Sequence, residues 1–145
     1  MFDASKLHRI SRALYLAGFA NVAHLVSAAG RILFSAHVPP EAEIGPGVEF
    51  GYGGIGVVVH RQAVIGRNVL ISPGVVIGGR SELPGAPVIE DEVKIGAGAK
   101  VLGPIRIGRG AKIGANAVVI HDVAAGDTVG GIPARSLHAK KRSVA

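Results

Sequence analysis

The chain of 145 residues has no cysteine and no tryptophan, and aromatic residues make up only 4% of it. The absence of cysteine excludes a disulfide scaffold, a zinc ribbon and a thiol nucleophile, and it fits the reducing cytoplasm, where we expect the protein to act. With so few aromatic side chains, a hydrophobic core has to be aliphatic. Glycine (22 residues) and proline (8 residues) are too frequent for a helical bundle.

Long uninterrupted apolar runs are also missing. The most apolar stretch, residues 13–34, is interrupted by Gly18, Asn21, His24 and Arg31, which predicts core or interface helices rather than a membrane span. We therefore expect no membrane contact, with an interfacial membrane role as the alternative. The first residues lack the apolar stretch of a secretory signal peptide.

The formal net charge is +6, which suits an anionic ligand such as a nucleic acid, a phosphorylated cofactor or a membrane surface. The one tight basic run, Lys140–Arg142, lies in a C-terminal tail over residues 138–145 and is typical of a solvated tail. Because no nucleic-acid-binding motif accompanies it, we expect no nucleic acid partner. No histidine or acidic residues have the spacing of metal ligands, so we expect no metal.

A six-residue repeat dominates the middle and the end of the chain. From residue 59 onward every sixth position is valine, isoleucine or leucine, and glycine often follows. The eleven positions are Val59, Ile65, Ile71, Ile77, Leu83, Ile89, Ile95, Val101, Ile107, Ile113 and Val119. Period six fits neither a helix nor simple strand alternation, and it predicts a parallel β-helix in which 18 residues close one triangular coil. The aliphatic residue of each hexad should point inward.

The first 36 residues follow a different pattern. Apolar residues recur there at helical spacing, and Gly18 and Asn21 are expected to divide the run into two helices. We therefore predict a mainly β protein with an N-terminal helical segment over residues 1–36 and a β-helix domain over residues 37–137. The apolar stripe of the helices needs cover, which predicts contacts within an oligomer.

Two breaks in the repeat mark the places where a site is expected, because loops on a rigid scaffold carry function. The first, residues 51–56, adds three residues and contains Tyr52, a candidate substrate contact; the second covers residues 78–87. Coil geometry places His37 and His60 on the same outer wall, with Cβ atoms on the order of 8 Å apart. Imidazole suits proton abstraction from a hydroxyl, so His60 is the candidate base and His37 its orienting partner or a substrate contact.

Three segments carry a resemblance to a known family. Residues 95–103 (IGAGAKVLG), residues 107–115 (IGRGAKIGA) and the ending Gly131–Arg135 (GIPAR) resemble the C-terminal half of serine acetyltransferases and, more broadly, hexapeptide-repeat acyltransferases with a left-handed β-helix. The resemblance covers about residues 36–137. It implies a left-handed coil, a homotrimer, and transfer of an acetyl group from acetyl-CoA to a small hydroxyl acceptor, either serine or a sugar or polysaccharide hydroxyl.

The same resemblance implies where the cofactor binds. In the family the CoA pantetheine arm lies in the groove between neighbouring subunits. The matching positions are Gly79 and Arg80 in the second break, Ala97 and Ala115 at coil corners, and Lys112 and Arg135 near the phosphates. Ala97 and Ala115 are 18 residues apart, so they should stack on one edge of the coil.

The catalytic residues of the family are not matched. The family's catalytic histidine falls at Tyr52 or Gly53, its aspartate partner falls near His37, and a further histidine falls near Ala86. Three explanations remain: His60 acts as the base from a displaced position, the acceptor differs, or transfer activity is lost. The alternative function is therefore an inactive β-helix scaffold or partner subunit, and a third is N-acyl transfer to a nucleotide-linked sugar.

Overall fold

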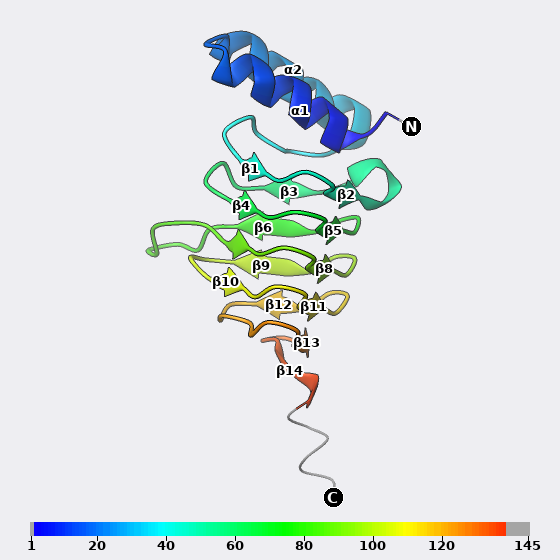
Figure 1. Ribbon diagram of the computed structural model, residues 1–145, viewed down its shortest axis with the longest axis vertical. Helices are drawn as coiled ribbons and strands as arrows, with labels where there is room; N and C mark the ends of the chain where they lie inside the picture. Colours follow the sequence, from blue (N-terminus) through cyan, green and yellow to red (C-terminus); the bar gives the residue numbers. More distant parts are fainter. Residues whose placement is uncertain (1, 139–145) are drawn as a thin grey trace, which may run out of the picture.

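The computed structural model describes residues 2–138, so most of the predicted basic tail, Lys140–Arg142 included, lies outside the described residues. The chain forms a tapering three-sided column of stacked coils with two helices on its first coil (Figure 1). The two helices are α1 (Ala4–Leu16) and α2 (Ala20–Phe34). A short 3-10 turn, η1 (Gly51–Gly54), lies in the first coil.

Three parallel sheets form the walls of the column. Sheet A contains β3 (Val58–Val59), β6 (Val76–Gly78), β9 (Lys100–Leu102) and β12 (Val118–Val119). Sheet B contains β1 (Glu43–Ile44), β4 (Val64–Ile65), β7 (Val88–Ile89) and β10 (Arg106–Ile107). Sheet C contains β2 (Glu49–Phe50), β5 (Leu70–Ile71), β8 (Lys94–Ile95), β11 (Lys112–Ile113), β13 (Thr128–Gly130) and the antiparallel β14 (Arg135–Ser136). From β1 to β13, successive strands along the chain therefore belong to different walls, and β14 folds back onto β13 in sheet C.

The register of the strand pairs confirms the predicted coil. Val59 pairs with Ile77, 18 residues on, which is one regular turn of three hexads. Phe50 pairs with Ile71, 21 residues on, because the first break adds three residues to that coil. Ile65 pairs with Ile89, 24 residues on, because the second break adds a full hexad, and the inward row therefore keeps its phase.

The core is the aliphatic row that the repeat predicts. Ile71, Ile77 and Ile107 are fully buried, and the residues two positions before such sites, for example Val75 and Val93, are fully buried as well. Each coil therefore contributes two inward residues per wall. Leu83 is the exception: the six-residue step predicts it to be inward, but it is 44% exposed in the loop of the second break.

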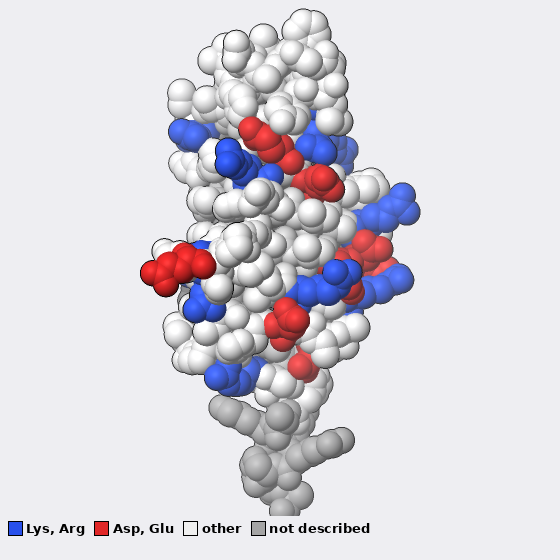
Figure 2. All heavy atoms as spheres, turned by 90° about the vertical axis from the view of Figure 1, so that its left-hand side faces the viewer, with Lys and Arg blue, Asp and Glu red and all other residues white. Residues whose placement is uncertain are grey.

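The two helices sit on the coil through small and polar residues rather than through their large apolar ones. The buried positions are Ala4, Ser5, His8, Ser11, Ala23, Ser27 and Gly30. Ser27 Oγ donates a hydrogen bond to the Val38 carbonyl at 2.9 Å. The apolar stripe of α2 faces outward, with Leu25 at 72% and Ile32 at 87% exposure. The upper part of this helical cap shows no charged residue on the face seen in Figure 2.

The helices do not reach the length and apolar character of a membrane span. Among residues 2–138, no helix is long and apolar enough to cross a bilayer. The two helices are separated at Gly18, whose positive φ of 92° suits glycine, and Asp3 caps the first of them by accepting the N–H groups of Ser5 and Lys6.

Candidate functional site

An open pocket of about 310 Å³ lies on the outer face of sheet A, beside the first two coils. His37, His60 and Arg61 provide its polar groups, and Val59 and Ile77 lie at its floor. The backbone explains the meeting of the two histidines. His37 forms a parallel bridge with Val58, and the N–H of His60 donates to the Ile77 carbonyl at 2.7 Å. The expected placement of His37 and His60 on one wall is thus what the structure has.

The imidazole of His37 is held by a residue from the helical cap. Arg31, in the last turn of α2, donates to His37 Nδ1 from Nε at 3.2 Å and approaches it with Nη2 at 3.0 Å. A guanidinium can only donate, so Nδ1 accepts and the neutral ring carries its proton on Nε2. Burial, and then the positive charge of Arg31, lower the pKa of His37, while Glu41 acts in the opposite direction.

His60 has a looser environment than His37. Its Nδ1 accepts a hydrogen bond from the backbone N–H of Gln62 at 3.1 Å, in an exposed position. The ring edge that carries Nε2 faces the start of the second break, because a Cβ built on Gly79 would lie 3.6 Å from Nε2. Gly79 therefore leaves open the space beside this imidazole.

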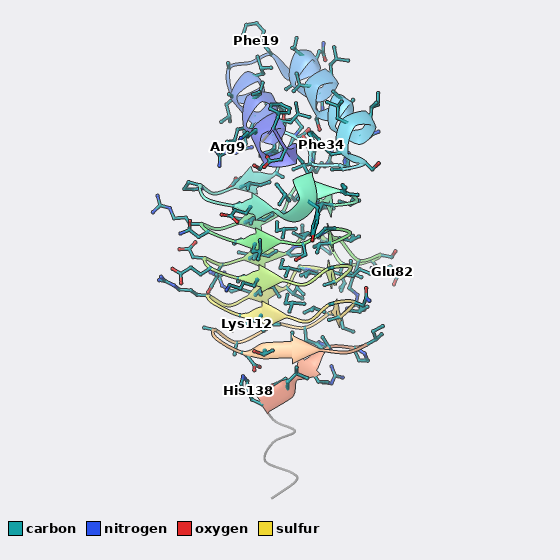
Figure 3. All side chains as sticks on the ribbon, turned by 90° about the vertical axis from the view of Figure 1, so that its right-hand side faces the viewer. Arg9, Phe19, Phe34, Glu82, Lys112 and His138 are labelled. Carbon is teal, nitrogen blue, oxygen red and sulfur yellow. The ribbon has the colours of Figure 1, made fainter. Side chains whose placement is uncertain are left out.

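The second break forms a loop that extends from the column, with Glu82 projecting beyond the coil (Figure 3). Arg80 and Leu83 form an antiparallel bridge that closes the turn, and Glu82 within it has a positive φ of 69°. The side chain of Arg80 lies against Gly103 of the next coil, where an added Cβ would meet Arg80 Cδ at 3.0 Å. Gly79 and Arg80 are both exposed.

A second group of predicted residues lies at the other edge of sheet A, where the chain enters it from sheet C. Ala97 and Ala115 are exposed in turns of successive coils, and the N–H of Asn116 donates to the Ala97 carbonyl at 2.9 Å. Tyr52 lies in the η1 turn of the first coil at the same edge, with a φ of 50° and 82% exposure. Glycines line the coils between them; a Cβ built on Gly74 would lie 3.7 Å from the backbone of Gly98.

Neither of the two predicted phosphate contacts lines the pocket with the two histidines. Lys112 lies on the outer face of sheet C and pairs with Lys94 of the coil before it. Arg135 lies in β14 at the end of the column and pairs with Gly130. Within one chain the structure therefore brings His37, His60 and Gly79 together and stacks Ala97 on Ala115, but it does not join these two groups.

Sequence reasoning missed two cations at the pocket. Arg61 directly follows His60 in the sequence, so its place at the pocket could have been predicted from that of His60. Arg31 belongs to α2, and no repeat links the rotation of this helix to the coil. Among the described residues, no group of three or more histidine or acidic side chains could hold a metal ion.

Comparisons with known proteins agree on the kind of protein that this chain resembles. Residues 86–121 match the family model described as bacterial transferase hexapeptide (six repeats). The chain is 43% identical to a serine acetyltransferase of Bacillus subtilis over 130 residues, which cover 88% of the chain and 59% of that protein. It is 37% identical to a serine acetyltransferase of Helicobacter pylori, and this match covers 90% of the chain and 77% of the relative.

A solved structure gives the same result in three dimensions. The crystal structure of serine acetyltransferase in complex with coenzyme A from Brucella abortus superposes with a TM-score of 0.88 at 37% identity, over 92% of this chain and 54% of that one. The left-handed parallel β-helix is the shared architecture. The chain spans about three fifths of the length of the first relatives that it matches, 57–60%.

Proposed function

The chain belongs to the serine acetyltransferase family, and we propose that it transfers the acetyl group of acetyl-CoA to a hydroxyl of a small acceptor in the cytoplasm. The observation that carries the proposal is the pocket on sheet A, where two imidazoles meet beside an exposed loop. The names of the relatives support the reaction type, and the serine hydroxyl is the first acceptor to test. A sugar hydroxyl is the second.

The cofactor is proposed to lie in the groove between two protomers of a homotrimer. One side of this groove is the edge with Ala97 and Ala115, where small side chains let a linear pantetheine arm approach the backbone. The other side is the neighbouring protomer's loop with Gly79 and Arg80, and Lys112 and Arg135 serve the phosphates. Such sharing explains why a single chain leaves the two residue groups apart.

His60 is the proposed general base. It takes the proton of the acceptor hydroxyl, and the oxygen attacks the carbonyl carbon of the thioester. The tetrahedral intermediate then collapses as the C–S bond breaks, and the CoA sulfur receives the proton from the imidazolium. The products are the O-acetylated acceptor and free CoA, so the atoms balance without a metal or an oxidant. Tyr52, at the edge of sheet A that also holds Ala97 and Ala115, is the proposed acceptor contact on the opposite side of the groove.

The ring of His60 has to turn before it can accept a proton in the pocket. In the observed arrangement the Gln62 N–H occupies Nδ1, so the neutral ring presents Nε2–H. A half-turn about the Cβ–Cγ bond moves Nδ1 to the edge that faces Gly79. The turn breaks one exposed hydrogen bond, which costs about 0.5–1.5 kcal/mol and is small beside a catalytic barrier. His37, held by Arg31, has no such freedom.

The test is release of CoA thiol from acetyl-CoA with serine and with sugar acceptors. We expect His60→Ala to lower kcat/KM about 100-fold or more, as loss of a general base does. His121→Ala is the matched control, because His121 is exposed and does not line the pocket. Unchanged turnover in His60→Ala would reject His60 as the base. Absence of transfer and of CoA binding in the wild-type protein would favour a scaffold without activity.

The proposed assembly has its own measurement. The outward stripe of α2, which includes Leu25 and Ile32, is proposed to be covered within the homotrimer, because large apolar side chains at 72% and 87% exposure favour burial. Sedimentation at micromolar concentration should give the mass of three chains, and Ile32→Glu should lower it. A monomer in the wild-type protein would contradict both the trimer and the shared cofactor groove.

A further inference from the structure

We propose that the sheet A pocket binds an anionic group, a carboxylate or a phosphate, on the acceptor molecule, so that the protein selects acceptors with a net negative charge. The inference rests on the proposed acetyl transfer, and it concerns which hydroxyl compound enters the site. It is carried by the hydrogen-bonding state of His37, by Arg31 and Arg61, and by the absence of acidic side chains from the pocket lining.

His37 is a fixed hydrogen-bond donor. Two nitrogens of Arg31, at 3.2 and 3.0 Å, occupy its Nδ1 side, so the free group of the neutral ring is Nε2–H. The charged groups that act on this imidazole are Arg31 from α2 and Glu41 from the turn after it. Because burial and Arg31 both lower its pKa, the ring stays neutral at pH 7 and keeps this donor form. Such an N–H can bind a carboxylate or phosphate oxygen but cannot accept from an ammonium group.

The charge around the pocket has one sign. Among the described residues that line it, Arg61 is the charged one, and Arg31 lies behind His37, to which it donates. No aspartate or glutamate is among these described lining residues. Glu41, the carboxylate that acts on His37, lies 3.1 Å from His24 Nε2 on the helical cap and does not line the pocket. An ammonium group of a substrate therefore meets the Arg61 guanidinium at the wall of the pocket, with Arg31 beyond His37, and no carboxylate from the described lining residues.

The wall of the pocket offers an apolar surface between its polar groups. Val58 is 40% exposed there, whereas Val59 and Ile77 are almost fully buried inside the column and Gly78 adds no side chain, so the polar groups surround a small apolar surface. A three-carbon hydroxy acid or an acidic sugar suits this arrangement, with the anionic group at His37 and Arg61. Its hydroxyl would then lie toward His60, the imidazole that is free to turn. The two histidines thereby have different roles: His37 orients the acceptor and His60 takes the proton.

The experiment compares four acceptors that share one three-carbon frame. Glycerate carries a carboxylate only, serine carries a carboxylate and an ammonium group, serinamide carries an ammonium group only, and glycerol carries neither. Charge-assisted hydrogen bonds predict a kcat/KM for glycerate about tenfold to a hundredfold above that for glycerol. The kcat/KM for serine should exceed that for serinamide by a similar factor. The kcat/KM for glycerate should exceed that for serine.

Three variants locate the effect. Arg61→Gln and Arg31→Gln should each reduce the preference for glycerate over glycerol about fivefold or more, with the larger change in KM. Arg67→Gln is the matched control, because Arg67 is exposed one hexad further along and does not line the pocket. All three side chains are exposed, so the fold should be retained, which circular dichroism checks.

Binding separates this inference from the proposed activity. Titration of glycerate into the protein, followed by the NMR signals of the histidine rings, should shift the His37 signals in the wild type and not in Arg61→Gln. If no acceptor is acetylated but glycerate still binds, the activity is wrong and the anion pocket stands. If acetylation proceeds at equal kcat/KM for glycerate, serinamide and glycerol, the anion pocket is wrong and the activity stands.

Discussion

His8 in α1 and Ala42 in the first coil are joined by a buried hydrogen bond, with His8 Nε2 3.1 Å from the Ala42 carbonyl oxygen. The carbonyl can only accept, so the imidazole donates through Nε2–H. His8 is 4% exposed, and it lies on the face by which the helical cap rests on the coil. The imidazolium form also carries a proton on Nε2, so burial of His8, rather than this hydrogen bond, ties the attachment of the cap to the protonation state of the side chain.

Stability should fall in acid because of His8. Burial, opposed by the bond to Ala42, lowers the pKa of His8 from 6.5 to about 4. The unfolded chain then binds the proton more readily than the folded one, so the contribution is complete above pH 6.5 and is lost as the pH falls toward 4. A pKa difference of this size corresponds to about 3 kcal/mol.

Urea unfolding at pH 7, 5.5 and 4 measures this effect. The free energy of unfolding of the wild type should decline between pH 6.5 and 4 more steeply than that of His8→Gln, which keeps a donor but does not titrate. His121→Gln serves as the control, since His121 is exposed. Equal slopes for the wild type and His8→Gln would show that this imidazole does not couple to folding.

Two residues of the same six-residue row should differ in their effect on stability. Ile95 is 1% exposed and packs inside the column, whereas Leu83 is 44% exposed in the loop. Ile95→Ala should cost about 2–5 kcal/mol through lost burial and the cavity that it leaves, and Leu83→Ala should cost less than about 1 kcal/mol. Denaturant titrations decide the matter. A similar cost at both positions would mean that Leu83 packs inward in solution.

The loop shows where the repeat fails as a predictor. The row of aliphatic residues predicts the three walls and the strand register, because each hexad forms one wall and three hexads close a coil. Leu83 is also aliphatic and lies at a position of the six-residue row, but it does not point into the column. Pro84 and Gly85 follow it, and the bridge between Arg80 and Leu83 turns the chain back outside the column. The insertion has the length of one hexad, so the later coils keep their phase. The six-residue spacing therefore continues through the loop and does not reveal it.

The site is less predictable from sequence than the column. Coil geometry predicts that His37 and His60 share a wall, because both flank inward residues one coil apart. The partner of each imidazole does not follow from the period. Arg31 reaches His37 only because the cap rests on small residues such as Ala23 and Gly30, and no spacing rule specifies that rotation of α2. The hydrogen-bonding role of each ring depends on these contacts.

A larger side chain at the proposed cofactor edge should weaken acetyl-CoA binding without unfolding the protein. Ala115→Trp places a large ring at an exposed turn, stacked beside Ala97, and should raise the KM for acetyl-CoA about tenfold or more. Ala125→Trp is the matched control, because Ala125 is exposed at a different corner of the coil. An unchanged KM for acetyl-CoA in Ala115→Trp, with the control also unchanged, would show that the cofactor does not bind at this edge.

A crystal structure with bound CoA would show where the acetyl donor lies. We expect a pantetheine arm that runs along Ala97 and Ala115 of one protomer and a thiol sulfur at the mouth of the pocket with His60. A sulfur that lies away from both histidines, or CoA bound on one protomer far from the loop at Gly79, would contradict this arrangement.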